Sequence, residues 1–182
     1  MDRYRFTDGV YVYFVTFTVK DWLPIFINPE ASQIIIDSLQ YSINTRGLRI
    51  NAYVIMPNHL HMIVFDKKFV NSNLKLTLTN FRKFTGRKLA NHIDNNLSDL
   101  YSISIRRKSL EDRFRQVWQP GWHAKGLLSE DVWIQKMNYI HENPVKNGYV
   151  NRPELWRYSS AGYWLNGEIG DIQVVPIELE DE

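Results

Sequence analysis

The alternation of apolar and polar positions near the start of the chain predicts a strand followed by a helix. Residues 9–19 (GVYVYFVTFTV) have strand composition and are apolar on both faces, which is typical of a central strand. Residues 28–47 carry isoleucines and leucines at helical spacing. Asn28 or Pro29 suits the start of this helix, and Gly47 suits its end.

The next segment predicts an antiparallel β-hairpin. Two apolar runs, 48–56 (LRINAYVIM) and 59–65 (HLHMIVF), are separated only by Pro57 and Asn58, which favour a tight turn. The second run is therefore expected to return beside the first as the third strand of the protein.

The middle of the chain predicts a second helix and then an irregular segment. Residues 72–92 begin with Ser or Asn as a cap and carry apolar residues on one side, so a helix is expected despite Gly86. Residues 93–114 show no steady period and are interpreted as a loop or mobile arm, longer than the fold requires.

A fourth strand and a third helix follow. Residues 115–128 (RQVWQPGWHAKGLL) predict a strand that is broken at Pro120-Gly121. The helix after it is expected to be capped by Ser129 and ended by Pro144.

This βαββαβα order predicts an α+β, ferredoxin-like fold, with a four- to five-stranded antiparallel sheet and helices packed on it. We expect one catalytic domain over residues 1–150. Residues 151–170, rich in aromatics, are expected to form a helical extension packed on the same domain, and residues 171–182 an acidic tail.

Composition narrows the class of protein. The 182 residues suffice for one domain with a real core, and the chain has no cysteine, so disulfides and thiolate metal sites are excluded. No segment approaches 18 uninterrupted apolar residues, and the N-terminal segment lacks the features of a secretory signal. We therefore expect a soluble, cytoplasmic protein without a membrane partner.

The net charge of +2 conceals an uneven distribution. The last twelve residues hold five acids and no base, which leaves 22 basic against 15 acidic residues elsewhere, a net charge of +7. The basic residues cluster at 82–88 and 106–115, with phenylalanine and tryptophan between and beside them. Such clusters suit single-stranded nucleic acid, although they also occur as ordinary solvated surfaces.

Two histidines interrupt the third predicted strand. Side chains alternate across a strand, so His59 and His61 are expected on the same face, about 7 Å apart. Two imidazoles so placed can share a divalent metal ion, but an isolated pair of this kind is also compatible with two histidines on a sheet surface.

Further candidate chemistry lies on the last predicted helix. Tyr139 and Asn143 are four residues apart and therefore share one helix face. A tyrosine can act as a nucleophile, and a metal held by His59, His61 and the Asn143 oxygen would make a phosphodiester more electrophilic. Taken alone, Tyr139 could equally be a packed aromatic residue and Asn143 a helix-ending residue.

The combination of these motifs is more specific than either alone. The segments MPNHLHMIV, YIHENPVKNGYV and WRYSSAGYW, in this order, resemble the REP-associated tyrosine transposases and their insertion-sequence relatives in the single-tyrosine HUH endonuclease superfamily. The resemblance covers nearly the whole chain and places the HUH motif, His59-Leu60-His61, on a central strand.

The resemblance implies a function as well as a fold. It makes Tyr139 the catalytic nucleophile and His59, His61 and Asn143 the ligands of Mg²⁺ or Mn²⁺. Tyr139 would attack single-stranded DNA, with a hairpin of REP type as the expected partner, and would form a 5′-phosphotyrosine link that a second 3′-hydroxyl can reverse. Relatives of this group favour a monomer over a homodimer.

Additional DNA contacts are expected at six basic or imidazole side chains. The candidates are His123, Lys125, Arg82, Lys83, Arg106 and Arg107. His123 is also compatible with a structural role.

Two alternatives stay open at this point. A non-catalytic, domesticated nucleic-acid-binding protein would leave the paired histidines without a task, and no aromatic-rich RNP1-like strand is visible. A two-histidine phosphodiesterase would need a second, separate histidine motif. Metal dependence together with a covalent tyrosine adduct distinguishes the transposase from both.

Overall fold

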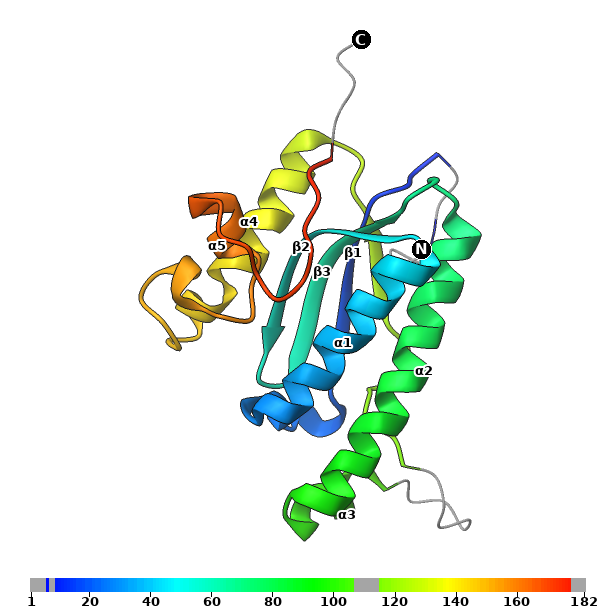
Figure 1. The fold of residues 1–182 in the computed structure, drawn as a ribbon, viewed down its shortest axis with the longest axis vertical. Coiled ribbons are helices and arrows are strands. Elements are labelled where there is room, and N and C mark those ends of the chain that lie inside the picture. The colour runs from blue at the N-terminus through cyan, green and yellow to red at the C-terminus, as the bar shows by residue number, and fades with distance from the viewer. Residues whose placement is uncertain (1–5, 7–8, 107–114, 178–182) are drawn as a thin grey trace.

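The computed structural model describes residues 6, 9–106 and 115–177, and within them the protein is α+β (Figure 1). Its sheet has four strands in the order β2-β3-β1-β4, and every neighbouring pair is antiparallel. This is the strand order of a ferredoxin-like fold, so the predicted fold class is confirmed. The strands are β1 (Tyr13–Thr18), β2 (Leu48–Met56), β3 (His59–Asp66) and β4 (His123–Gly126).

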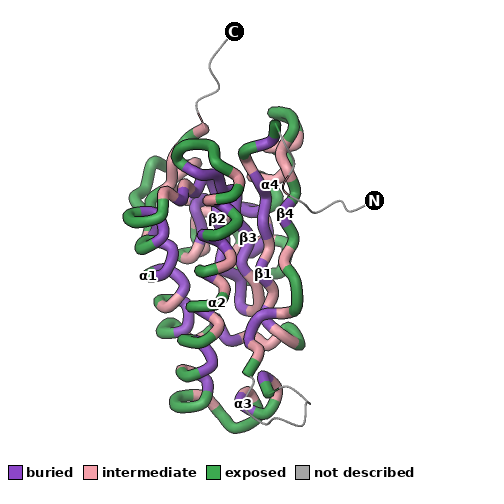
Figure 2. The backbone as a smooth tube through the Cα atoms, turned by 90° about the vertical axis from the view of Figure 1, so that its right-hand side faces the viewer, coloured by how far each residue is buried: buried purple, intermediate pink, exposed green. Residues whose placement is uncertain are grey.

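Helices cover both faces of the sheet. The α1 helix (Pro29–Arg46) and the α2 helix (Asn71–Asn96) lie side by side on one face, and α4 (Glu130–Lys146) lies on the other (Figures 1 and 2). None of the helices in the described ranges combines the length and apolar composition of a membrane span. The shorter elements are α3 (Asp99–Ile105), α5 (Ala161–Asn166) and the 3-10 turns η1 (Lys20–Trp22), η2 (Ile25–Ile27) and η3 (Pro153–Leu155).

The two faces of β3 supply two separate apolar layers. Leu60, Met62 and Val64 are buried in the larger layer, which the sheet forms with α1 and α2. Ile63, on the opposite face, packs in a smaller layer that includes Ile140 of α4. Because side chains alternate along a strand, the histidines of β3 share the face of Ile63 and therefore lie beneath α4.

The first helix and the hairpin follow the sequence closely. The Asn28 side chain accepts a hydrogen bond of 3.0 Å from the Ala31 backbone amide, which caps α1. Gly47 ends the helix with a φ of 74°, a conformation that favours glycine. Pro57 and Asn58 form the turn between β2 and β3, as predicted.

The prediction of a loop over residues 93–114 is wrong for its first part. The α2 helix continues to Asn96, and α3 follows it. Leu97, Tyr101 and Ile105 recur every fourth residue and pack against the larger core layer, which stabilises the helical conformation. Residues 107–114 lie outside the described part of the chain.

Three predicted boundaries also change. The first strand spans only Tyr13–Thr18, and β4 begins at His123, after the Pro120-Gly121 break. The α4 helix starts at its Ser129 cap but does not end at Pro144. It continues to Lys146, so Pro144 lies in the last turn, where it removes one hydrogen bond of the helix.

The C-terminal extension covers the outer edge of β2. The Ile55 amide donates a hydrogen bond of 2.8 Å to the Tyr158 carbonyl, and the Ser160 amide donates one of 3.0 Å to the Tyr53 carbonyl. Further along, the Val175 amide donates to the Ile50 carbonyl at 2.9 Å. The extension is therefore joined to the sheet by main-chain hydrogen bonds. The division into a domain, an extension and a tail stays a prediction.

Candidate functional site

The candidate site is built on β3, which lies between β2 and β1 in the sheet. His59 and His61 project from the same face of this strand, and their ring centroids are 4.5 Å apart. His61 is 6 % exposed, whereas His59 is half-buried. The structure therefore brings together the two imidazoles that the sequence predicted as a pair.

Each imidazole is oriented by a second side chain. The Nδ1 atom of His61 lies 2.8 Å from Oγ1 of Thr16, and Nδ1 of His59 lies 2.6 Å from Oδ1 of Asn58. An amide oxygen can only accept, so His59 carries its proton on Nδ1. Its Nε2 atom is then left with a free lone pair, and the Thr16 hydroxyl allows the same tautomer for His61.

Burial keeps both imidazoles neutral. It lowers the pKa of His59 to about 4. The pKa of His61 lies well below its ordinary value because of burial first, and then because a protonated His61 would be repelled by a protonated His59 and by the positive charge of Lys136. A neutral imidazole is the form that binds a metal ion.

Tyr139 reaches this pair from α4. Its hydroxyl lies 3.5 Å from Nε2 of His61, and its ring meets the Phe14 ring edge-on at 6.0 Å. The neighbouring Ile140 is fully buried in the smaller core layer, which fixes the rotation of the helix. Tyr139 itself is 40 % exposed, so its hydroxyl is accessible from outside.

Lys136 is part of the same site, although the sequence analysis did not identify it. Its Nζ atom lies 5.2 Å from the Tyr139 ring centroid and 4.7 Å from that of Phe14. Burial lowers the pKa of Lys136, and the positive charge of Lys125 lowers it further. Its position three residues before Tyr139 was the signal that could have found it.

Asn143 lies one turn after Tyr139 and is buried. Its Oδ1 atom accepts a hydrogen bond of 3.0 Å from Nδ2 of Asn147, and no hydrogen bond joins it to His59 or His61. The structure thus places Asn143 on the nucleophile's helix without joining it directly to the histidine pair.

The donor set fits a divalent metal ion in part. The Nε2 atoms of His59 and His61 are suitable ligands, and the partners of their Nδ1 atoms provide the orientation that metal-binding histidines usually have. The described residues contain no group of three His, Cys, Asp or Glu side chains that could hold a metal. A third ligand would therefore come from Asn143, from the substrate or from water.

Two predicted DNA contacts lie on the same face of the sheet as the histidine pair. Thr16 of β1 pairs with His61 on one side and with His123 on the other, so these three residues form a row across the sheet. Lys125 occupies the next position of β4 on this face, and both β4 side chains are exposed.

The other predicted contacts lie elsewhere. Arg82 and Lys83 belong to α2, which covers the opposite face of the sheet. Arg106 directly follows α3 and is exposed. Arg107 lies outside the described residues.

Trp22 was also missed by the sequence analysis. Its ring stands edge-on to His59 at 6.1 Å, and its side chain is 57 % exposed. Trp22 and the preceding Asp21 both have positive φ, at 56° and 53°. Strained backbone of this kind is concentrated at functional sites.

Comparison with known proteins gives a likeness of fold. No protein-family model matches the chain, and no curated protein sequence matches it either. A solved REP-associated tyrosine transposase bound to a REP hairpin superposes with a TM-score of 0.61 and 18 % identity, over 99 % of this chain and 96 % of that one. A putative transposase from Deinococcus radiodurans gives a TM-score of 0.46 and 17 % identity, over 79 % and 97 % of the two chains.

Proposed function

We propose that the protein is a transposase-like enzyme that cuts and rejoins single-stranded DNA through a covalent bond to Tyr139. The observation that carries this proposal is the approach of the Tyr139 hydroxyl to within 3.5 Å of His61 Nε2, beside a second neutral imidazole. A nucleophile next to two oriented metal ligands is the arrangement that metal-assisted phosphoryl transfer needs.

In the proposed reaction the Tyr139 oxygen attacks a phosphorus atom of the DNA strand. The new bond joins the phosphate to the tyrosine, and the bond to the 3′-oxygen breaks. The tyrosine proton passes to solvent, and the leaving strand takes up a proton as its 3′-hydroxyl. Because the number of phosphodiester bonds is unchanged, another 3′-hydroxyl can reverse the attack without ATP.

The side chains around Tyr139 have distinct roles in this reaction. His59 and His61, with Asn143 as the candidate third ligand, would hold Mg²⁺ or Mn²⁺, which supplies Lewis-acid activation of the phosphate. Lys136 and Lys125 present positive charge to the phosphate, which becomes more negative on its non-bridging oxygens in the transition state. The likeness to a hairpin-bound protein supports a hairpin-forming DNA substrate.

A gel assay for covalent adducts tests the proposal. Labelled single strands from the DNA flanking the gene are incubated with the protein and Mn²⁺ or EDTA, and the products are separated under denaturing conditions. Wild type should give an adduct only with Mn²⁺, and Tyr139→Phe should give none. Tyr149→Phe is the matched control, since Tyr149 is similarly exposed, at 50 %, and should react as wild type.

The same assay tests the ligands. Asn143→Ala should raise the Mn²⁺ concentration needed for half-maximal adduct by roughly 10- to 100-fold if Asn143 binds the metal. Asn96→Ala, at the end of α2, serves as the control. Cleavage without an adduct would favour a phosphodiesterase, and hairpin binding with neither would favour a domesticated DNA-binding protein.

A further inference from the structure

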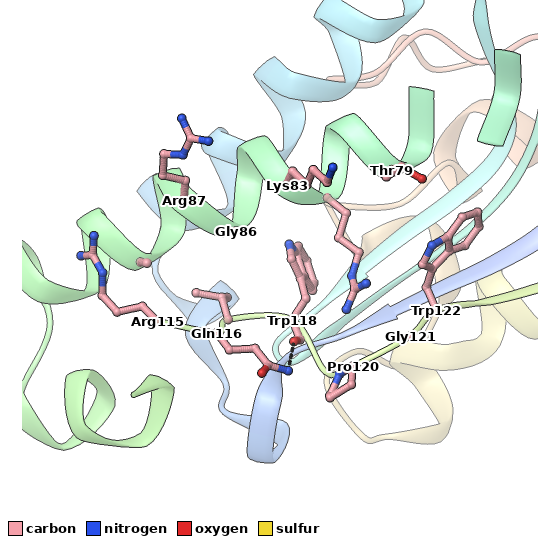
Figure 3. Close-up of a pocket in the computed structure, with 13 residues that line it drawn as sticks. Thr79, Lys83, Gly86, Arg87, Arg115, Gln116, Trp118, Pro120, Gly121 and Trp122 are labelled. Carbon is pink, nitrogen blue, oxygen red and sulfur yellow. Dashed lines mark hydrogen bonds between the residues drawn. The ribbon is translucent and has the colours of Figure 1, made fainter. Parts of the chain in front are cut away.

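A basic cavity of roughly 630 Å³ lies against α2 (Figure 3). Because α2 covers the face of the sheet opposite to α4, the cavity is on the side away from Tyr139. One wall is the face of α2 from Thr79 to Ala90, and the other is the segment 115–122 that leads to β4. Its volume is in the range of sites for small molecules and single nucleotides.

The cavity is strongly positive. Four cationic side chains line it, three from α2 and one from the opposite wall: Arg82, Lys83, Arg87 and Arg115. Arg115 is paired with Asp94 and also donates to Asn91. Lys83 and Arg87 are exposed and have no ion pair within the described ranges. Two charges are therefore available to an anion.

Arg82 is a partly buried cation in the wall of the cavity. One of its terminal nitrogens donates to the Gln119 carbonyl. Its Nε atom is buried and has no hydrogen-bond partner among the described residues. Burial also lowers the pKa of the guanidinium. Arg82 therefore adds its positive charge to the α2 wall of the cavity, between Thr79 and Lys83 in the lining.

The tryptophans of the cavity have different roles. Trp118 is buried and donates a hydrogen bond of 3.1 Å to Oγ1 of Thr85. Its ring packs so close to Gly86 that a Cβ there would lie 3.3 Å from it. Trp122 is only half-buried, and it therefore presents an aromatic surface at the end of the cavity near β4 (Figure 3).

The position of Trp122 connects the cavity to the candidate active site. Trp122 directly precedes β4, the edge strand, and packs against the core layer beneath α2. The next residue, His123, and then Lys125 lie on the face of Tyr139. A single strand of DNA could therefore pass around this edge from one site to the other.

We propose that this cavity binds one unpaired nucleotide of the DNA strand that Tyr139 cuts. The phosphate would lie between Lys83 and Arg87, and the base would stack on Trp122. A concave site with an aromatic surface suits an unpaired base better than the side of a duplex. That the bound strand is the one being cut rests on the proposed function.

A binding experiment tests the phosphate contacts. Fluorescence anisotropy with labelled oligothymidylate, in EDTA and with Tyr139→Phe as the parent, separates binding from reaction. The slope of log K against log salt is about −0.7 for each phosphate neutralised on a single strand, so loss of the one phosphate held by Lys83 and Arg87 should make the slope of the Lys83→Ala, Arg87→Ala variant less steep by about 0.7. Lys67→Ala with Lys68→Ala removes the same charge outside the cavity.

The affinity for oligothymidylate distinguishes the cavity double variant from its control. We expect the cavity double variant to bind oligothymidylate at least about tenfold more weakly than the parent at low salt. Equal slopes and affinities for the two double variants would overturn the proposal, as would the absence of oligothymidylate binding by the parent.

Photocrosslinking tests the base contact. The oligothymidylate then carries 5-iododeoxyuridine, and the crosslinked peptide is identified by mass spectrometry. Crosslinks at Trp122 are expected, whereas crosslinks confined to the face of Tyr139 would overturn the proposal. If Trp122 is crosslinked but the wild-type protein forms no Tyr139 adduct, the cavity proposal is supported and the proposed strand transfer is rejected. For the adduct assay the same two double substitutions are made in the chain that keeps Tyr139; if both variants form the adduct equally well, strand transfer is kept and the cavity proposal is rejected.

Discussion

The Tyr139 hydroxyl lies 3.5 Å from Nε2 of His61, although the two residues are 78 positions apart in the chain. One comes from a helix on the small core layer and the other from a central strand of the sheet. Any change that alters the packing of α4 on β3 will therefore alter the distance between the proposed nucleophile and the proposed metal.

Thr16 is expected to act as a positioning residue for His61. Thr16→Val keeps the shape of the side chain but removes the hydroxyl that lies 2.8 Å from Nδ1 of His61. Loss of such an orienting partner commonly costs 10- to 100-fold in metal affinity, and we expect a loss of about that size. Mn²⁺ titration by calorimetry measures it.

A matched control is available on α1. Thr45→Val also removes a hydroxyl that donates a hydrogen bond, here to the Tyr41 carbonyl, but on an exposed surface away from the site. The free energy of unfolding of both variants should lie within about 1.5 kcal/mol of the wild-type value. Equal Mn²⁺ affinity in the two variants would show that Thr16 does not orient the ligand.

Lys136 is expected to be needed for reaction rather than for folding. Lys136→Met keeps the length of the side chain and its packing over Phe14 but removes the charge beside Tyr139. The rate of adduct formation should fall about 10- to 100-fold, because a developing negative charge loses a nearby cation. Lys146→Met, on an exposed position of the same helix, should react at the wild-type rate.

Trp22 is expected to stack on a DNA base next to His59. Trp22→Gly removes the ring and suits the positive φ of this position, so the fold should be retained. A stacked base contributes about 1–3 kcal/mol, which corresponds to roughly 5- to 150-fold weaker binding of single-stranded DNA. Trp22→Phe should keep most of the affinity, and equal binding by both variants and wild type would exclude the contact.

The protein is expected to lose stability at alkaline pH because of the buried Tyr53 hydroxyl. It is buried without a hydrogen-bond partner of standard geometry among the described residues, and its pKa is raised by burial and then by the Asp171 carboxylate. The unfolded chain loses this proton near pH 10.0, while the folded chain keeps it. Stability is therefore present below pH 10.0 and falls above it, by at most about 1.4 kcal/mol per pH unit.

Tyr53→Phe isolates this contribution. The variant should be as stable as wild type at neutral pH, or up to about 1 kcal/mol more stable, because a buried and unpaired hydroxyl is removed. Above pH 10.0 the difference in the free energy of unfolding should grow in favour of the variant. Urea unfolding of both proteins, at neutral pH and above pH 10.0, measures this difference in the free energy of unfolding. A difference that does not change with pH would contradict the prediction.

The sequence predicted those parts of the site that depend on local pattern. Alternation along one strand was enough to pair His59 with His61, and helical spacing was enough to align Tyr139 with Asn143. Thr16 could not be assigned to His61 in the same way, because the register of β1 against β3 depends on the packing of the whole sheet. The basic cavity was missed for the same reason, since its walls come from α2 and a segment beyond α3.

The missed helix α3 shows a different limit. Leu97, Tyr101 and Ile105 have the spacing of a helix that packs on a core. The intervening Leu100 and Ile103 are 74 % and 60 % exposed, so the apolar residues do not mark one face. Only the contacts with α2 and the core distinguish the buried set from the exposed one.

The extension along β2 limits how the protein can associate through its sheet. Main-chain groups of Tyr53 and Ile55 already bond to residues 158–160, so this edge offers little to another chain. In the described part of the chain, β4 has a strand neighbour only on its β1 side. Two copies could therefore pair through their β4 strands. The remaining sheet edges of such a pair would be the covered edges of β2, which a third copy could not extend. Pairing of this kind therefore stops at two copies and does not lead to fibres.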